Sequence, residues 1–279
     1  MKTILITGAT DGIGLETAKE LAALGNEIIL HGRNEAKVRH ARDAVQRYAP
    51  NATLHTEHAD LADLAAVKDM AQRLSERLAK LDVLINNAGV YMTERRLSKE
   101  GYEMTLAVNH LSHFLLTNLL LPLLKKSTVP RVVTVSSGAH ASGHIDFDDM
   151  NRERHYDAYR VYSNSKLANI LFANELARRE PWLASNSLHP GVIDTKLLHA
   201  GFSMSGASLA EGARTPVYLA TAPEDTGISG NFFNRCAVVQ PSSQALDQRL
   251  AQQLWEWSGN AVRPWLPDNA YQGMSRPYP

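Results

Sequence analysis

Short apolar segments alternate with longer helical segments over most of this chain. The apolar segments indicate six β-strands at about residues 4–7, 27–30, 53–58, 83–86, 131–135 and 184–189. Amphipathic patterns fill the intervals between them, and Asn34 and Asp63 stand where two of these helices are expected to begin. This alternation predicts an α/β fold, a doubly wound parallel sheet of about seven strands with helices on both faces.

The length and composition suit one domain with a sizeable core. The chain has 279 residues, of which 44% are hydrophobic and 21% are charged, as in ordinary globular proteins. From about Val262 the sequence becomes rich in Pro, Gly, Asn, Tyr and Arg. We therefore expect a single domain over residues 1–260 and an irregular C-terminal extension over residues 261–279.

Charge and cysteine content argue against several classes of function. The formal net charge is zero, so no basic field favours nucleic acid or an anionic membrane. Cys236 is the only cysteine, and the eleven histidines lack the short paired spacing of a metal site. The most apolar stretch, Phe114–Leu124, is too short to span a bilayer and contains Asn118 and Pro122. We expect a cytoplasmic protein with no signal peptide, no integral membrane segment, no nucleic-acid partner and no metal.

Three glycines stand at the first strand-to-helix junction, in the segment Thr7–Gly14 (TGATDGIG). Glycine permits a tight turn there and lets a phosphate approach the backbone amides at the helix N-terminus. The spacing Gly-x-x-x-Gly-x-Gly differs from the Gly-x-Gly-x-x-Gly of the commoner dinucleotide fingerprint. Glycines also serve in simple turns, but this position in an alternating chain favours dinucleotide binding in a Rossmann-type fold.

The end of the second strand indicates which dinucleotide binds. An acidic residue is expected there for the ribose of NAD, yet the segment 29–34 (ILHGRN) has no carboxylate. Arg33 is suited to pair with a 2′-phosphate, the alternative being a solvated arginine at a helix start. Asp60 and Leu61 follow the third strand and would lie beside the adenine, unless Asp60 simply caps a helix. We expect NADP(H) as the preferred cofactor, with NAD(H) as the alternative.

Tyr162 and Lys166 are four residues apart on an expected helix at about 156–179. That spacing puts a phenol and an ammonium on one helix face. A neighbouring cation favours the phenolate, and lowering the phenol pKa from about 10 to about 7 takes about 4 kcal/mol. A lysine together with an oxidised nicotinamide would supply that energy. The pair predicts proton transfer at a carbonyl or alcohol oxygen, whereas an isolated Tyr-x-x-x-Lys is more often a solvated pair.

These features resemble the short-chain dehydrogenases/reductases, and within that family the retinol dehydrogenases and the WW-domain-containing oxidoreductase. The likeness extends from Thr3 to about Trp257. The motifs that carry it are Thr7–Gly14, Asn86–Gly89 (NNAG), Val108–Thr117, Tyr162–Leu171 and Pro190–Thr195 (PGVIDT). Many retinol dehydrogenases carry a membrane anchor before the first strand. No such segment precedes the first strand here, which argues against a membrane retinoid as substrate.

The resemblance implies a catalytic tetrad of Asn109, Ser137, Tyr162 and Lys166. Tyr162 would exchange a proton with the substrate, Lys166 would bond the nicotinamide ribose, and Ser137 would donate to the substrate oxygen, with Ser136 as the neighbouring alternative. Asn109 would hold a water that relays protons to Lys166, or else cap a local helix kink. The dinucleotide contacts that it implies are Gly8, Thr10, Asp11, Gly12, Ile13, Gly14, Arg33, Asn34, Asp60, Leu61, Asn87, Ala88, Gly89, Tyr162, Lys166, Pro190, Gly191, Val192, Ile193 and Thr195.

An inserted segment at 140–159 lengthens the interval between the serine and the tyrosine. We expect the substrate to lie between this insertion and the segment 196–215, which suits a fairly apolar molecule. The apolar residues expected to line it are Leu197, Leu198, Phe202 and Met204. The histidines His113, His140 and His144 are interpreted as surface or substrate-loop residues.

Family members usually pair through two long helices, which here are expected at about 102–126 and 156–179. We therefore expect a homodimer or homotetramer. The sequence as a whole predicts an NADP(H)-dependent oxidoreductase that interconverts an aldehyde or ketone and its alcohol by hydride transfer. The alternative is a regulatory module that binds the dinucleotide without turnover. A complete Asn–Ser–Tyr–Lys set argues against that alternative, because a sensor does not need an acid.

Overall fold

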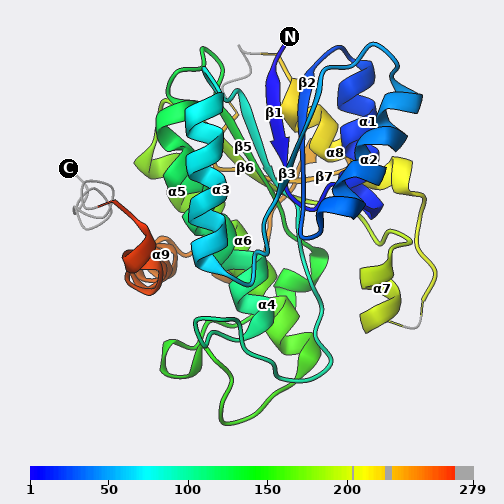
Figure 1. The fold of residues 1–279 in the computed structure, drawn as a ribbon. Coiled ribbons are helices and arrows are strands. Elements are labelled where there is room, and N and C mark those ends of the chain that lie inside the picture. Colours follow the sequence, from blue (N-terminus) through cyan, green and yellow to red (C-terminus); the bar gives the residue numbers. More distant parts are fainter. Residues whose placement is uncertain (203, 224–227, 268–279) are drawn as a thin grey trace.

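The computed structural model describes residues 1–202, 204–223 and 228–267, which form a central sheet with helices on both faces (Figure 1). The sheet order is β3-β2-β1-β4-β5-β6-β7-β8, with β8 antiparallel to β7 and every other pair parallel. The strands are β1 (Thr3–Ile6), β2 (Glu27–Gly32), β3 (Leu54–His58), β4 (Val83–Asn86), β5 (Arg131–Val135), β6 (Ala184–His189), β7 (Phe232–Asn234) and β8 (Ala237–Val238). The predicted doubly wound fold is confirmed.

The helices alternate with these strands as the sequence predicts. They are α1 (Gly12–Ala23), α2 (Glu35–Tyr48), α3 (Leu64–Arg77), α4 (Met104–Leu106), α5 (Ser112–Leu124), α6 (Ala158–Arg179), α7 (Lys196–Gly201), α8 (Leu209–Thr221) and α9 (Gln248–Val262). Asn34 and Asp63 cap α2 and α3 as expected, since each side chain accepts a hydrogen bond from a first-turn amide. A π-turn at Ala107–Leu111 joins α4 to α5, so the helix expected at about 102–126 runs from Met104 to Leu124 with one widened turn.

The sheet has eight strands rather than the predicted seven or so. The two strands beyond the six located in the sequence are β7 and β8, which form a short hairpin at the edge of the sheet. Its turn residues Arg235 and Cys236 have φ angles of 49° and 62°, a conformation that turns of this kind usually give to glycine or asparagine. The sequence therefore carries no glycine signal for this hairpin.

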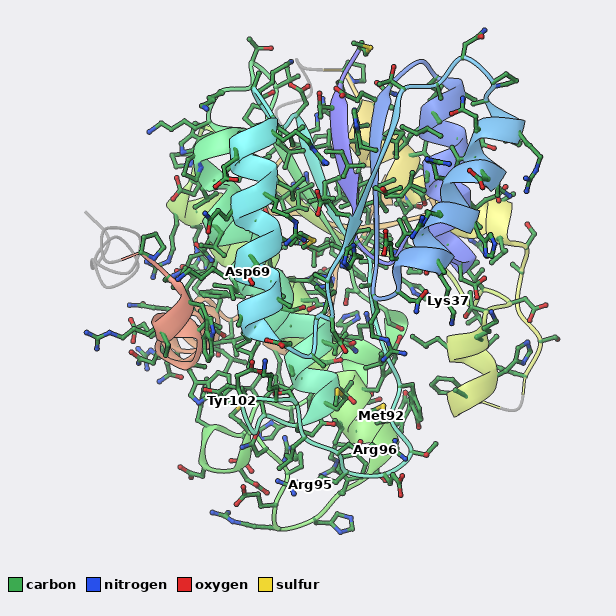
Figure 2. The ribbon with its side chains drawn as sticks, viewed as in Figure 1. Lys37, Asp69, Met92, Arg95, Arg96 and Tyr102 are labelled. Atoms are coloured by element: carbon green, nitrogen blue, oxygen red, sulfur yellow. The ribbon has the colours of Figure 1, made fainter. Side chains whose placement is uncertain are left out.

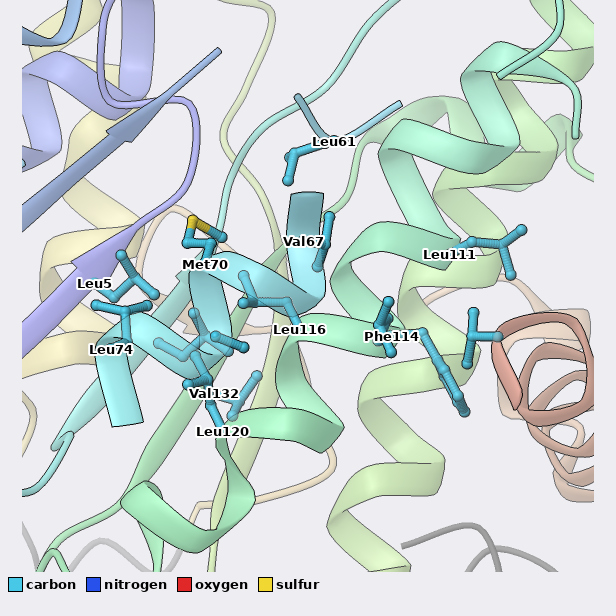
Figure 3. Close-up of a cluster of buried hydrophobic side chains, with 14 of the residues drawn as sticks. Leu5, Leu61, Val67, Met70, Leu74, Leu111, Phe114, Leu116, Leu120 and Val132 are labelled. Atoms are coloured by element: carbon cyan, nitrogen blue, oxygen red, sulfur yellow. The ribbon is translucent and has the colours of Figure 1, made fainter. Parts of the chain in front are cut away.

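Alternate residues of the central strands face opposite helical layers. Leu5 and Val132 face α3 and α5, where Met70, Leu116 and other apolar side chains bury them (Figure 3). Their neighbours along the same strands face the layer of α1, α2 and α8; these residues include Ile4, Ile6, Val133 and Val135. A strand buried on both faces is apolar at consecutive positions, which explains why these segments lack a period of two.

Helix α9 covers the outer side of α5 and α6, away from α1 and α2 (Figure 1). The Trp255 ring stacks on Phe172 of α6 at 5.9 Å and meets Phe114 of α5 edge-on at 4.8 Å. Nearly all of α6 beyond its first turn is buried or half-buried in the single chain, as is α5 apart from Pro122. Most of both helices is thus covered within the single chain as far as the structure describes it, and the pairing of copies expected through them stays a prediction.

The C-terminal boundary differs from the one expected at residue 260. Helix α9 continues to Val262, and a short 3-10 turn at Arg263–Trp265 follows it. Val262 and Leu266 are buried in the main core. Residues 261–267 therefore pack on the domain, while the rest of the expected extension lies outside the described residues.

One helical stretch, Met104–Leu124, is long and apolar enough to cross a membrane by length and composition, with a mean hydropathy of 1.3. However, 83% of the 18-residue window to which this value belongs is buried inside the protein, packed between α3, α6 and the sheet. Its apolar character is accounted for by the core, as expected for a helix covered on every side.

Candidate active site

The carboxyl ends of the first six strands open onto one cavity of about 730 Å³. Strand order reverses between β1 and β4, and ligands of doubly wound sheets bind at such a crossover. The glycine turn after β1 and the segment Asn87–Gly89 after β4 line the cavity on either side of this point. Ser137, Tyr162 and Lys166 line the same cavity, so the predicted dinucleotide and catalytic residues share one space.

The glycine turn lies closer to the segment that follows β4 than any side chain at Gly8 or Gly14 would allow. A β-carbon added to Gly14 would lie 2.4 Å from Asn87 Nδ2 and 2.4 Å from Gly8 O, and one on Gly8 would lie 2.8 Å from Ala88 Cα. The Asn87 amide holds this approach by donating to Thr7 O at 2.8 Å. The resulting cradle of bare backbone at the N-terminus of α1 fits a pyrophosphate.

The adenosine end of the cavity contains most of the residues predicted for it. Arg33 and Leu61 line it, as does Asp60, whose carboxylate also accepts a hydrogen bond from Ala62 N at 3.0 Å. Asn34 does not line the cavity, because its side chain turns to cap α2 by accepting from Lys37 N at 3.1 Å. The cavity lining therefore does not support its predicted cofactor contact, and its side-chain oxygen instead caps the N-terminus of α2.

Tyr162, Ser137 and Lys166 form the polar end of the cavity. Tyr162 is 7% exposed and lies close enough to the Ser137 hydroxyl for that group to lower its pKa, while Lys166 Nζ lies 5.5 Å from the centre of the Tyr162 ring. Ser136, the alternative to Ser137, donates to the Lys166 carbonyl at 2.6 Å, so its hydroxyl is committed to α6. The strand thus places Ser137 as the hydroxyl beside the phenol, as predicted.

Burial favours the uncharged form of both Tyr162 and Lys166 and shifts their pKa values accordingly. It raises the pKa of Tyr162 to about 12, which the nearby Ser137 hydroxyl partly offsets, and it lowers the pKa of Lys166 to about 8. Desolvation is the largest cause for each group, and the expectation that Lys166 together with an oxidised nicotinamide lowers the phenol pKa toward 7 stays a prediction for the complex with the cofactor. At neutral pH Tyr162 is a protonated acid beside a cationic Lys166.

Asn109 lies in the π-turn and is fully buried. Its amide accepts from Val90 N at 2.8 Å and donates to Val90 O at 3.1 Å and to Ser165 Oγ at 3.0 Å. It does not line the cavity itself. Its side chain therefore fixes the loop after β4 against α6, and the expectation that Asn109 holds a water stays a prediction.

The family follows from this geometry together with the comparisons. Residues 2–205 match the family of the short chain dehydrogenases. The chain is a short-chain dehydrogenase. Human retinol dehydrogenase 14 is 40% identical to it over 285 residues, covering 92% of this chain and 85% of that protein. The resemblance to the retinol dehydrogenases inferred from the motifs is thereby confirmed.

Solved structures of related proteins have the same fold. An uncharacterized protein from Mycobacterium paratuberculosis has a TM-score of 0.79 at 36% identity, over 94% of both chains. A short chain dehydrogenase from Shigella flexneri, complexed with NADP, has a TM-score of 0.70 at 25% identity, covering 85% of this chain and 97% of that one.

In this dehydrogenase, α7 and the segment before it pass across the cavity. The segment's predicted cofactor residues Pro190, Gly191, Val192, Ile193 and Thr195 all line it. Thr195 also caps α7 by accepting from Leu198 N at 3.2 Å. Lys196 forms an ion pair with Asp11 in the glycine turn, and that hydrogen bond is the main cause that lowers the pKa of Asp11. The start of α7 is thereby attached to the dinucleotide end of the cavity.

The far end of the cavity is aromatic and apolar. The Phe202 ring contacts those of Tyr91, Tyr159 and Tyr162 at centroid distances of 5.5, 5.9 and 6.5 Å. The other apolar side chains lining this end are Met92, Met104, Leu197, Leu198 and Met204. The expected contribution of segment 196–215 is thus observed.

The insertion at 140–159 contributes less to the cavity than expected. Of its residues only the terminal Tyr159 lines the cavity, while Ile145 packs with α6 and α9. The loop after β4 provides the opposite wall instead, through Met92 and Arg96 (Figure 2). Sequence gave no sign of this loop's role, because it carries neither a strand nor a helix pattern.

Two of the three histidines interpreted as surface or substrate-loop residues are buried, whereas the third, His144, is exposed. His140 is 5% exposed, and its ring meets Phe232 edge-on. His113 is 1% exposed and lies beneath the glycine turn. Their positions on an apolar helix and in a short 3-10 turn gave no sign of this burial. Within the described ranges no three His, Cys, Asp or Glu side chains cluster as a metal-ligand set.

Proposed function

We propose that this chain is an NADP(H)-dependent oxidoreductase that interconverts an aldehyde or ketone and its alcohol. The observation that carries the proposal is the convergence of Ser137, Tyr162 and Lys166 at one end of a cavity whose other end is the glycine cradle. A redox reaction of this kind needs a dinucleotide and a proton donor within reach of one carbon–oxygen bond. Both requirements meet in this cavity.

Each polar group has a distinct task in that reaction. Tyr162 donates its proton to the carbonyl oxygen during reduction and accepts it back during oxidation. Ser137, whose hydroxyl lies beside the phenol, donates to the same oxygen as negative charge develops on it. Lys166, close to the Tyr162 ring, stabilises the phenolate that remains. A nicotinamide bound beside them supplies the hydride.

The protonation states favour carbonyl reduction near neutral pH. Burial holds the pKa of Tyr162 at about 12, so the phenol carries the proton that reduction consumes. Lys166, with a pKa lowered to about 8 by burial, is still mostly charged at pH 7. Reduction should therefore slow as the pH rises through about 8 and the cation is lost.

NADP(H) is the proposed cofactor because the adenosine end carries cations. Arg33 lines the cavity at the end of β2. Lys37 lies at the end of α2 that faces α7 (Figure 2), and its charge helps to lower the pKa of Asp11 after the larger effect of Lys196. Two cations suit a 2′-phosphate, and the related Shigella flexneri structure is complexed with NADP.

The substrate end supports a fairly apolar carbonyl compound. Its walls are methionine, leucine and aromatic side chains, with Arg96 as a cation at the mouth that is paired with Glu94. Such a lining binds through burial of apolar surface and leaves the carbonyl oxygen as the group to be oriented. A small, fully hydrated sugar would leave this surface uncovered.

Oxidation of NADPH, followed at 340 nm with a panel of apolar aldehydes and ketones, tests the proposal. We expect turnover, and we expect Tyr162→Phe to lose about 10²–10⁴-fold in kcat, the usual contribution of a placed acid. Tyr159→Phe is the matched control, because Tyr159 also lines the cavity but has no lysine one turn later. NADPH binding without turnover on any carbonyl would favour the alternative, a regulatory module.

A further inference from the structure

One buried imidazole joins the dinucleotide turn to the helix that carries Asn109. His113, in the first turn of α5, is 1% exposed. Its Nε2 lies 3.0 Å from Thr7 Oγ1, and its Nδ1 lies 3.2 Å from the main-chain oxygen of Asn109. The reaction proposed above does not use this ring, so the function of its contacts with Thr7 and Asn109 remains to be explained.

The contact with Thr7 reaches the floor of the cofactor cradle. Thr7 is the first residue after β1, and its hydroxyl accepts hydrogen bonds from Asn87 N at 2.9 Å and from Ala88 N at 3.0 Å. This one oxygen therefore ties the ends of β1 and β4 together at the point where the strand order reverses. Through Thr7, His113 supports the backbone that the pyrophosphate would contact.

The contact with Asn109 reaches the π-turn. In this widened turn the Ser112 amide bonds back to Ala107 O, and side chains of the next turn donate to the neighbouring carbonyls. Ser112 Oγ donates to Val108 O at 2.8 Å, and His113 Nδ1 faces Asn109 O. The imidazole thus helps to hold the residue whose amide is bonded to Val90.

Asn109 in turn positions the loop beside Lys166. A β-carbon on Gly89 would lie 3.5 Å from Lys166 Nζ and 3.6 Å from Asn109 Oδ1, so this glycine lies between the two side chains. A displacement of Asn109 would move Val90 and Gly89 with it, and so alter the space around the lysine.

The hydrogen-bond pattern defines one tautomer of the ring. A carbonyl only accepts, so Nδ1 carries the proton and Nε2 is an acceptor 3.0 Å from the Thr7 hydroxyl, which also has Ile85 O as an acceptor at 3.3 Å. Burial lowers the pKa of His113 to about 3, and the nearby Lys166, His31 and His110 act in the same direction, although the Asn109 carbonyl opposes them. The ring is therefore neutral at physiological pH and can serve both contacts at once.

We propose that His113 is a positioning residue that couples cofactor binding to proton transfer, by holding Thr7 of the dinucleotide turn and the carbonyl of Asn109 through its two ring nitrogens. This inference rests on the function proposed above. It assigns the Nε2 contact to cofactor affinity and the Nδ1 contact to the reaction rate.

Amide side chains separate the two contacts. Asparagine at this position places its amide nitrogen where Nδ1 lies, while the longer glutamine reaches the place of Nε2. His113→Asn should therefore keep the bond to Asn109 O, His113→Gln should keep the bond to Thr7, and His113→Phe should lose both. His110 is the matched control. It lies in the same helical stretch, is also 1% exposed, and bonds instead to Ser258 of α9 at 2.7 Å.

The experiment measures the NADPH dissociation constant by fluorescence and kcat at saturating NADPH over pH 6–9. Loss of one buried hydrogen bond corresponds to roughly a tenfold change. We expect His113→Asn to weaken NADPH binding about tenfold with a smaller fall in kcat. His113→Gln should lower kcat about tenfold and shift its pH profile, with a smaller change in binding. His113→Phe should show both effects, and His110→Phe should lower the melting temperature with neither.

The inference is overturned if the three His113 variants change binding and kcat in the same proportion, or if they behave like His110→Phe. Wild-type protein that binds NADPH but turns over no carbonyl overturns the proposed function instead. The dissociation constants of His113→Asn and His113→Gln still decide the Thr7 half of the inference in that case, since they need no turnover.

Discussion

Acid should destabilise this protein well above the pH at which most carboxylates titrate, because three histidines are buried in neutral form. His31, His110 and His113 are each at most 2% exposed. Burial is the main cause that lowers their pKa values, to about 4, about 3 and about 3. His31 also accepts from Gly8 N at 3.4 Å and contacts Ala59 O at 3.1 Å, so protonation would cost it the Gly8 bond.

The sign and size of the effect follow from linkage. An unfolded histidine titrates near 6.5, so between that pH and the folded pKa the unfolded chain binds more protons. Stability contributed by these rings is therefore complete above about pH 7 and is lost as the pH falls below 6.5. At pH 5 the loss is about 2 kcal/mol for each ring and about 6 kcal/mol for the three, against a total of about 5–15 kcal/mol for a typical domain.

Urea unfolding followed by circular dichroism at pH 7.5, 6, 5.5 and 5 measures this loss. We expect the midpoint to fall steadily over that range. His110→Phe replaces one titrating ring beside Phe114 and Phe172, so it should reduce the loss between pH 7.5 and 5 by about one third. The reasoning would be refuted if the free energy of unfolding did not change between pH 7.5 and 5. It would also be refuted if His110→Phe lost as much stability over that range as the wild type.

Four further outcomes test the cofactor site, the oligomeric state and the arrangement of the helices. Gly14→Ala should weaken NADPH binding more than tenfold, because its β-carbon meets backbone at 2.4 Å, whereas Gly25→Ala, with open space around it, should affect stability alone. Arg33→Ala should reduce the ratio of kcat/KM for NADPH over NADH about tenfold or more if this guanidinium binds the 2′-phosphate. Light scattering tests the expected homodimer or homotetramer: two or four times the chain mass of 30.8 kDa would confirm it, and 30.8 kDa would contradict it. Trp255→Ala, which removes the stacking on Phe172, should lower the melting temperature.

Much of the site was predictable because it follows from local sequence and chain direction. Parallel strands place their carboxyl ends at one edge of the sheet, so motifs that follow β1, β4, β5 and β6 meet there without further information. Tyr162 and Lys166 share a helix face by their spacing alone. Every predicted cofactor or catalytic residue except Asn34 and Asn109 lines the cavity. Those two exceptions have side chains bonded to backbone in ways that only the folded neighbours define.

The sequence by itself determined the order of strands and helices, the dinucleotide turn and the tyrosine–lysine pair, because each depends on residues close together in the chain. Tertiary structure alone decided the features that depend on distant contacts. Helix α9 packs Trp255 against Phe114 and Phe172. Burial raises the Tyr162 pKa to about 12. His113 contacts Thr7, which lies 106 positions earlier in the chain. Desolvation and long-range hydrogen bonds arise only when the chain has folded, which is why no local pattern announced them.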